Sequence, residues 1–173
     1  MKSRVLGCVF ALLIGCGGDG NADVCEGNVC HCTEDGIRAA IAEGGGPFTF
    51  DCEGQRAIAT DAEIVIDKDV ILDAGGDVTV DGNMDHRVFS VPEGVTATLD
   101  GFAVTGGLGL QNFGSITNLG TLHVIRSQVS GNASTGIQNF GTLTLTDSGV
   151  SGNSGESRLI REAWCESIRS RKR

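Results

Sequence analysis

The stretch GTLHVIRSQVSGN at residues 120–132 is followed 21 residues later by a close copy, GTLTLTDSGVSGN at residues 141–153. Across residues 116–132 and 137–153, ten of seventeen positions are identical at this constant offset. The last four letters recur more weakly further back, as VTGG at residues 104–107 and VDGN at residues 80–83, so that successive copies lie 24, 25 and 21 residues apart. Periods of roughly 20 to 30 residues indicate a solenoid, in which each repeat buries its apolar face only against its neighbours.

The local pattern within the repeats indicates which kind of solenoid forms. Apolar and polar residues alternate over short β-rich runs that end in Gly, Asn or Asp, as is typical of strands. Leucine-rich repeats need a denser leucine frame, and ankyrin or tetratricopeptide repeats need helical spacing. We therefore predict an all-β fold, a parallel β-helix of about four coils with three short strands per coil, over residues 33–153. The side chains expected to point inward are Val70, Leu72, Val78, Val80, Val104, Leu122, Val124, Val129, Leu143, Leu145 and Val150.

Asparagines recur at two turn positions of the repeat. Asn83, Asn132 and Asn153 share one position, and Asn118 and Asn139 share another. Stacked asparagines can bond from coil to coil as amide ladders. We expect these five residues to have a structural role.

A single short helix is predicted before the repeats. Thr33 is a suitable N-cap for the segment EDGIRAAIAE, which has two acidic residues in its first turn and Gly44 as its stop. We expect this helix to cap the open N-terminal end of the solenoid.

The first 15 residues predict a signal peptide. A basic start precedes an apolar run at residues 5–14 that is too short to span a bilayer. The sequence LIGC at residues 13–16 resembles the lipobox of bacterial lipoproteins, which implies cleavage before Cys16 and a lipid on its sulfur. Gly17 stands where an Asp would favour inner-membrane retention, so the resemblance implies an outer-membrane lipoprotein. Residues 16–32 then form a lipid-anchor linker and a Cys-rich segment.

Four cysteines of the exported chain lie close together, and they are Cys25, Cys30, Cys32 and Cys52. In an oxidising compartment we expect two disulfides among them, for which three pairings are open. A zinc site would need better paired ligands and a second His near the cluster, and haem attachment would need C-x-x-C-H. Cys165 remains as the odd thiol.

Several stretches, namely FTFDCEG, DKDVILDAGG, RVFSV and GTLTLTDSGVSGN, together resemble exported right-handed parallel β-helix proteins of the pectate-lyase-like superfamily. The repeats are similar to those of chlamydial polymorphic outer-membrane proteins. The resemblance implies a right-handed coil, and it extends from about Thr33 to Asn153. Enzymes of this superfamily act on polysaccharides through grouped carboxylates, calcium-binding aspartates or a basic residue on one sheet face.

The sequence DGNMDHR at residues 81–87 contains the best candidates for such chemistry. A lyase or hydrolase would use Asp81, Asp85, His86 and Arg87 as acid/base groups. The equivalent positions of later coils hold only hydroxyl residues in place of carboxylates, so a polar loop is the simpler interpretation. We therefore expect no catalytic residues.

The other candidates for metal or catalytic chemistry are weaker. Asp73, Asp77 and Asp81 lack the G-G-x-G-x-D repeat of calcium-binding β-helices, so we expect no metal. His31 stands among cysteines, and His123 alternates with apolar neighbours and should point outward. No cofactor is expected.

The composition narrows the possible partners. A formal charge of −9 over 173 residues argues against nucleic-acid binding. We expect a lipid-anchored envelope protein that acts as a surface binding or structural module and meets a polysaccharide or another envelope protein. A polysaccharide lyase or hydrolase is the alternative.

The repeat stops after Asn153, and residues 154–173 form a basic tail with six basic and three acidic residues. Two interpretations are open. Apolar residues at helical spacing predict a helix that plugs the C-terminal end of the solenoid, and they are Leu159, Ile160, Ala163, Trp164 and Ile168. Alternatively, the tail is a shifted or truncated reading frame, and the chain is a remnant of a longer repeat protein.

Overall fold

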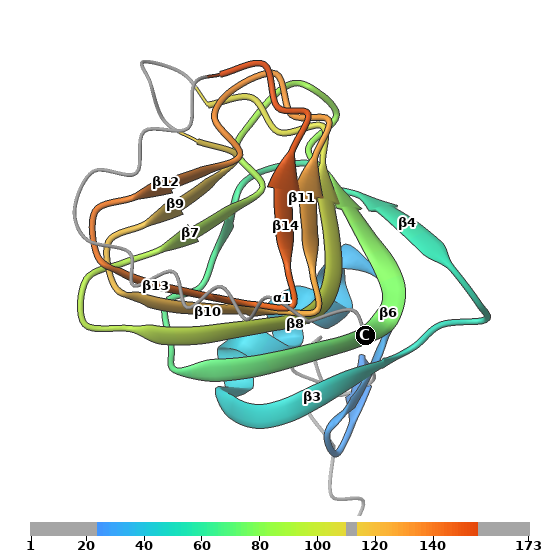
Figure 1. Cartoon of the computed structure of the whole chain (residues 1–173). Coiled ribbons are helices and arrows are strands. Elements are labelled where there is room, and N and C mark those ends of the chain that lie inside the picture. Colours follow the sequence, from blue (N-terminus) through green and yellow to red (C-terminus); the bar gives the residue numbers. More distant parts are fainter. Residues whose placement is uncertain (1–23, 110–113, 156–173) are drawn as a thin grey trace, which may run out of the picture.

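The computed structural model describes residues 24–109 and 114–155, and there the chain winds into a parallel β-solenoid of about five turns with an N-terminal helix (Figure 1). The strands of the turns, in chain order, are β3 (Gly45–Asp51), β4 (Arg56–Ala59) and β5 (Ile64–Val65); β6 (Val70–Asp81) and β7 (Phe89–Val91); β8 (Thr96–Thr105) and β9 (Ile116–Asn118); β10 (Thr121–Ile125), β11 (Gln128–Ser130) and β12 (Ile137–Asn139); and β13 (Thr142–Thr146) and β14 (Gly149–Ser151). The predicted parallel β-helix is confirmed.

The turns stack into three walls. One wall has the strand order β3-β6-β8-β10-β13, a second contains β4, the later parts of β6 and β8, and then β11 and β14, and a third has the order β12-β9-β7-β5. Strands β6 and β8 pass through two walls, and they bend between them. Gly101, with φ of +70°, lies at this bend, where a Cβ would come 2.7 Å from the nitrogen of Gly76. Only glycine fits this approach without a shift of the backbone.

The register of the strands follows the repeat. Val80 pairs with Val104, Val104 with Val129, and Val129 with Val150, all in parallel. Leu122 likewise pairs with Leu143. The offsets of 24, 25 and 21 residues read from the sequence are therefore confirmed as the steps between turns.

The core lies inside the coil, and nine of the eleven side chains predicted to point inward are buried. The exceptions are Leu145, which is 37% exposed, and Val150, which is half-buried. Both belong to the last turn, where no further described turn lies above them. Three phenylalanines that the repeat did not indicate are the largest fully buried side chains, and they are Phe48, Phe89 and Phe102.

The prediction of about four coils was one too few. The unrecognised turn is the first, β3 to β5, which shares none of the repeat letters. Its pairing with β6 shifts register between Gly45 and Phe48, so a constant offset does not describe it.

The N-terminal end of the solenoid is covered. Helix α1 (Glu34–Glu43) has the predicted caps: the Thr33 hydroxyl accepts a hydrogen bond from the Gly36 N–H at 3.1 Å, and the Gly44 N–H donates to the Ala40 carbonyl at 3.0 Å. Its apolar face packs into the core, with Ile37 fully buried. The helix therefore closes the interior of the first turn.

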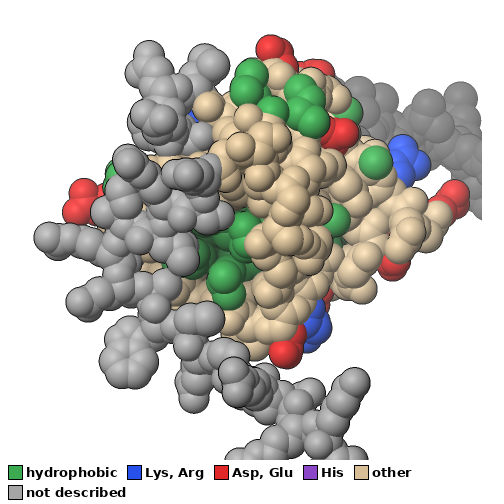
Figure 2. All heavy atoms as spheres, turned by 45° about the horizontal axis from the view of Figure 1, so that its top comes forward, with side chains coloured by type: hydrophobic (Ala, Val, Ile, Leu, Met, Phe, Trp, Pro, Cys, Tyr) green, Lys and Arg blue, Asp and Glu red, His purple; other side chains and the backbone are tan. Residues whose placement is uncertain are grey.

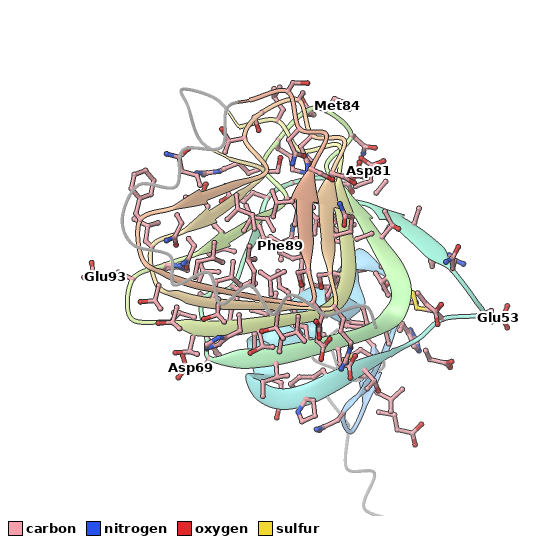
Figure 3. All side chains as sticks on the ribbon, viewed as in Figure 1. Glu53, Asp69, Asp81, Met84, Phe89 and Glu93 are labelled. Carbon is pink, nitrogen blue, oxygen red and sulfur yellow. A yellow bond between two sulfur atoms is a disulfide. The ribbon has the colours of Figure 1, made fainter. Side chains whose placement is uncertain are left out.

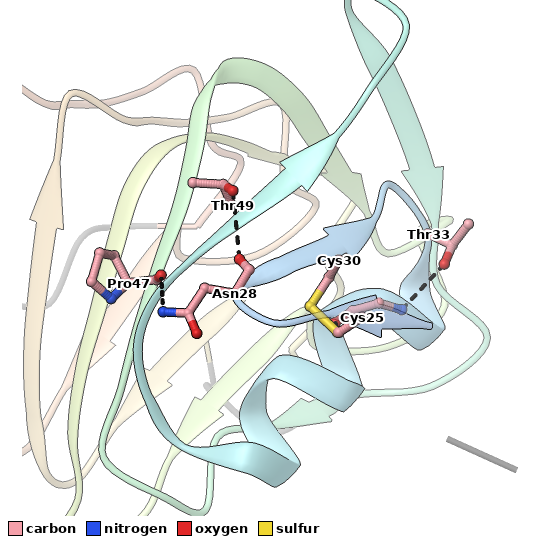
Figure 4. Close-up of a disulfide and its surroundings, with 7 residues drawn as sticks. Cys25, Asn28, Cys30, Thr33, Pro47 and Thr49 are labelled. Carbon is pink, nitrogen blue, oxygen red and sulfur yellow. Dashed lines mark hydrogen bonds between the residues drawn. A yellow bond between two sulfur atoms is a disulfide. The ribbon is translucent and has the colours of Figure 1, made fainter. Parts of the chain in front are cut away.

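A hairpin that the sequence did not predict covers the backbone edge of the same end. It consists of β1 (Cys25–Glu26) and β2 (Val29–His31), and β2 pairs in parallel with β3. Between them, Asn28 donates its amide to the Pro47 carbonyl at 3.0 Å and accepts the Thr49 N–H on its own carbonyl at 2.8 Å (Figure 4). The first turn thus has a paired strand on its outer side.

The four cysteines form the two expected disulfides, with the pairing Cys25–Cys30 and Cys32–Cys52. The first closes the β1–β2 hairpin. The second ties the start of α1 to the end of β3, because Cys32 directly precedes the N-cap and Cys52 follows the strand. Both bonds therefore reinforce the N-terminal cover.

Asparagines form ladders between the last turns. The Asn118 amide donates to the Asn139 side-chain oxygen at 2.7 Å, and the Asn132 amide donates to Asn153 in the same way at 2.7 Å. The prediction for Asn83 was wrong: its side chain is exposed and donates to the Thr60 carbonyl at 3.3 Å. A glycine occupies the equivalent place in the next turn, so no amide is available there to continue the ladder.

Within residues 24–109 and 114–155, no helix combines the length and the apolar character that crossing a membrane requires.

Candidate functional site

The loop from β6 to β7 holds the four polar residues singled out in the sequence, near the upper rim of the solenoid in Figure 3, where Asp81 and Met84 are labelled. The Asp81 carboxylate accepts the Asn83 N–H at 2.9 Å, which stabilises the turn directly after the strand. His86 contacts the Thr60 hydroxyl through Nε2 at 2.9 Å. Asp81 and His86 therefore already have structural roles in this loop.

Arg87 forms an ion pair with Glu63 at 2.7 Å, and the side chains of both are partly buried. Thr60 and Glu63 belong to the turn before, so His86 and Arg87 fasten the loop to that turn. Asp85 is exposed at the loop surface. This arrangement is that of a polar loop that connects two turns.

The aspartates considered for calcium lie on different parts of β6. Asp73 accepts the Gly75 N–H at 3.0 Å at the bend, Asp77 is exposed beyond it, and Asp81 ends the strand. Within the described ranges, no group of three or more His, Cys, Asp and Glu side chains is placed to hold a metal ion.

The two histidines outside the loop are on strands. His31 is exposed on β2, and His123 lies on the outward side of β10 between two buried neighbours, as expected. In the sheet, His123 has Thr98 on one side and Thr144 on the other.

A surface that the sequence reasoning missed lies on the outside of the wall formed by β8, β10 and β13. We call it the threonine face, and it consists of the outward residues Thr96, Thr98, Thr121, Thr142, Thr144 and Thr146. Thr96, Thr121 and Thr142 are direct cross-strand neighbours and form one row. The signal was present in the runs TATLD, TLHVI and TLTLT, whose polar positions are in phase at the offsets already recognised.

The strands fix the spacing of the threonine face. Neighbouring strands lie about 4.8 Å apart, and successive outward residues on one strand are about 6.7 Å apart. Hydroxyls therefore recur on a flat grid. A second row carries Thr98, His123 and Thr144, so the grid is interrupted once by an imidazole.

Charged groups flank the threonine face instead of crossing it. Asp100 ends the outward row of β8, and Arg126 follows β10, and the two form an ion pair at 2.7 Å. The Asp69 carboxylate accepts the Thr96 N–H at 2.7 Å at the opposite end of the same strands. The middle of the face is therefore polar and close to neutral.

The residues on which the lipoprotein prediction rests, 1–15 and Cys16, lie outside the described residues, as do residues 156–173 of the tail. No known protein family, curated protein or solved structure matches this chain.

Proposed function

We propose that this chain is a lipid-anchored protein of the cell envelope, an outer-membrane lipoprotein, whose β-helix acts as a surface binding and structural module and not as an enzyme. The observation that carries the proposal is the threonine face, a flat polar grid on a rigid wall. Two disulfides also fit an exported protein, because disulfides persist in oxidising compartments.

The chemistry of the face favours an extended neutral polysaccharide as the ligand. Hydroxyls at regular spacing both donate and accept hydrogen bonds, which matches a polymer of repeating sugar hydroxyls. The chain as a whole carries −9, which disfavours acidic polysaccharides. An envelope protein is the other partner that the test must distinguish.

Binding can be tested with one substitution and one matched control. Thr121 and Thr79 are both half-buried outward threonines, but Thr79 lies on the second wall, outside the threonine face. Thr121→Val removes one hydroxyl while keeping a β-branched side chain. We expect it to weaken retention on insoluble neutral glycans about fivefold, as for the loss of one hydrogen bond of about 1 kcal/mol, with Thr79→Val unchanged.

Two results would contradict this assignment. If neither soluble nor insoluble glycans retain the protein, the polysaccharide is the wrong ligand. If Thr121→Val and Thr79→Val bind equally, the threonine face is not the binding surface.

The anchor has its own test in cells that export the protein. Cys16→Ser should abolish incorporation of labelled fatty acid and release the protein from the membrane fraction, because stable anchoring needs more than one acyl chain and Cys16 would carry them. Cys8→Ser is the matched control and should keep the label. Persistence of the Cys16 variant in membranes would refute the lipoprotein assignment.

The enzymatic alternative predicts new reducing ends or unsaturated products when the protein is mixed with polysaccharides, with or without calcium. Such products, lost in Asp85→Ala and Arg87→Ala, would replace the binding function by a lyase or hydrolase. Within the described ranges, no contact of these two side chains favours that outcome over the loop role.

A further inference from the structure

The C-terminal end of the solenoid presents an unpaired backbone edge. Strand β13 pairs with β10, and β14 pairs with β11, and no described strand lies on their other side. The Thr142 N–H donates to Gly120, and the Thr146 carbonyl accepts from Arg126, so these two residues face β10. Because alternate residues of a strand in a parallel sheet bond to opposite sides, the backbone groups of Leu143 and Leu145 point away from it.

The same end also exposes apolar side chains. Leu145 is 37% exposed and Val150 is half-buried, whereas their register partners Val124 and Val129 are 1% and 0% exposed. Figure 2 shows hydrophobic side chains in the middle of this end of the molecule. An unpaired edge with apolar side chains is a ready template for association, so it requires a cover.

The N-terminal end of the same molecule shows what such a cover looks like. There, α1 places its apolar face against the interior of the first turn, with Ile37, Ala40 and Ile41 buried. An amphipathic helix of ten residues is sufficient for that purpose.

Residues 156–173 begin directly where the described chain leaves the last turn, after Gly155. Their apolar residues have helical spacing, and 18 residues of helix would extend about 27 Å, enough to cross the end of the coil. The segment also differs in charge from the rest of the chain. It holds six basic and three acidic residues, which leaves seven basic and nineteen acidic residues in positions 1–155.

We propose that residues 156–173 form an amphipathic helix that covers the open end of β13 and β14 and packs against Leu145 and Val150. A tethered segment has a high effective concentration at an edge only a few residues away, which favours it over a second copy of the chain. Its net positive charge further favours contact with the acidic solenoid. This proposal is independent of the binding function above.

The chain contains a single tryptophan, Trp164, and it lies within the proposed helix. In the purified full chain with intact disulfides, we expect blue-shifted Trp164 emission and an acrylamide quenching constant several-fold below that of the urea-unfolded chain. Both values should be independent of protein concentration, and the protein should sediment as a monomer.

A pair of substitutions tests where the segment docks. Leu145 on the open end and Ile71 on the outer side of β6 are similarly exposed, at 37% and 42%. Leu145→Asp should raise the quenching of Trp164 several-fold, whereas Ile71→Asp should leave it unchanged. Ile168→Asp should have the same effect as Leu145→Asp without touching the solenoid, which separates undocking from unfolding of the last turn.

Each alternative occupant gives a distinct result that would overturn the proposal. Fully exposed Trp164 in the unmodified chain means that the segment does not dock, as a shifted reading frame predicts. Burial that appears only at high concentration, together with a dimer, assigns the edge to a second copy. Burial that appears only with vesicles containing anionic lipid assigns the segment to a membrane surface.

Discussion

The two ends of this solenoid close the same repeat in different ways. At the N-terminal end, α1 fills the interior, β2 pairs with the edge of β3, and two disulfides secure both elements. At the C-terminal end, the described chain stops with β13 and β14 unpaired on their outer side and Leu145 partly exposed. Since each turn of a solenoid is stabilised mainly by its neighbours, a turn with one neighbour is weaker than a turn with two. We therefore expect stability to decrease from the covered end toward the open one.

The largest predicted effect compares the middle of the solenoid with its open end. Leu122 is fully buried between Ala97 and Leu143, whereas Leu145 has a described neighbour on one side only. Leu122→Asp should cost about 4 kcal/mol, because it buries an unpaired charge, and Leu145→Asp about 1 kcal/mol. Urea unfolding followed by circular dichroism measures both. Equal costs would show that the last turn is covered as fully as an inner one.

The disulfides should contribute unequally to the covered end. Cys32–Cys52 closes a separation of 20 residues, and Cys25–Cys30 a separation of 5. In the chain-entropy model, removing the first by a double Cys→Ser substitution should cost about 3 kcal/mol and removing the second about 2 kcal/mol. Both variants can be compared in the same urea titration. The reverse order would mean that the hairpin contributes more to the cover than the tether between α1 and β3.

The asparagine ladders offer a smaller comparison along the same axis. Asn118 is fully buried and donates both to Asn139 and to the Thr142 carbonyl, so Asn118→Ala should cost about 2 kcal/mol by leaving these acceptors unpaired. Asn153 lies half-buried in the last turn, where water can replace its bonds, so Asn153→Ala should cost about 1 kcal/mol. A larger loss for Asn153 would argue against a weaker open end. Amide exchange of the two turns provides an independent measure.

The smallest effect concerns the cap of α1. Thr33→Ala removes the acceptor for the Gly36 N–H and should cost about 1 kcal/mol, whereas Thr33→Ser keeps it and should be nearly neutral. If the two variants are equally stable by thermal unfolding, the N-terminal cover does not depend on this cap.

The sequence predicted those parts of the fold that repeat. The offset between Leu122 and Leu143 is visible in the letters because both turns use the same residues at the same phase. The helix was also predictable, since its caps are local signals at Thr33 and Gly44. The first turn was missed because its strands are held by packing of Phe48 and by pairing with β6, neither of which leaves a repeated letter.

The candidate sites were less accessible to sequence reasoning. Two disulfides were expected, but the choice among three pairings depends on how β2 lies beside β3, which is a tertiary contact. The loop residues His86 and Arg87 were placed near one another correctly, but their partners Thr60 and Glu63 lie one turn earlier, at an offset that the repeat did not reveal. The threonine face was overlooked because attention to inward residues hides the phase of the outward ones.

The in-register pairing of the last two turns makes the length of this molecule a quantity that changes in whole steps. Leu122 meets Leu143, and Val129 meets Val150, at an identical spacing of 21 residues. A further copy of residues 133–153 inserted after Asn153 would therefore extend the rod by one turn, about 4.8 Å, and lengthen the threonine face by one row. An insertion one residue longer or shorter would turn the inward side chains of the new strands to the outside. Growth by duplication is thus open to this architecture at one end, in units that the register itself dictates.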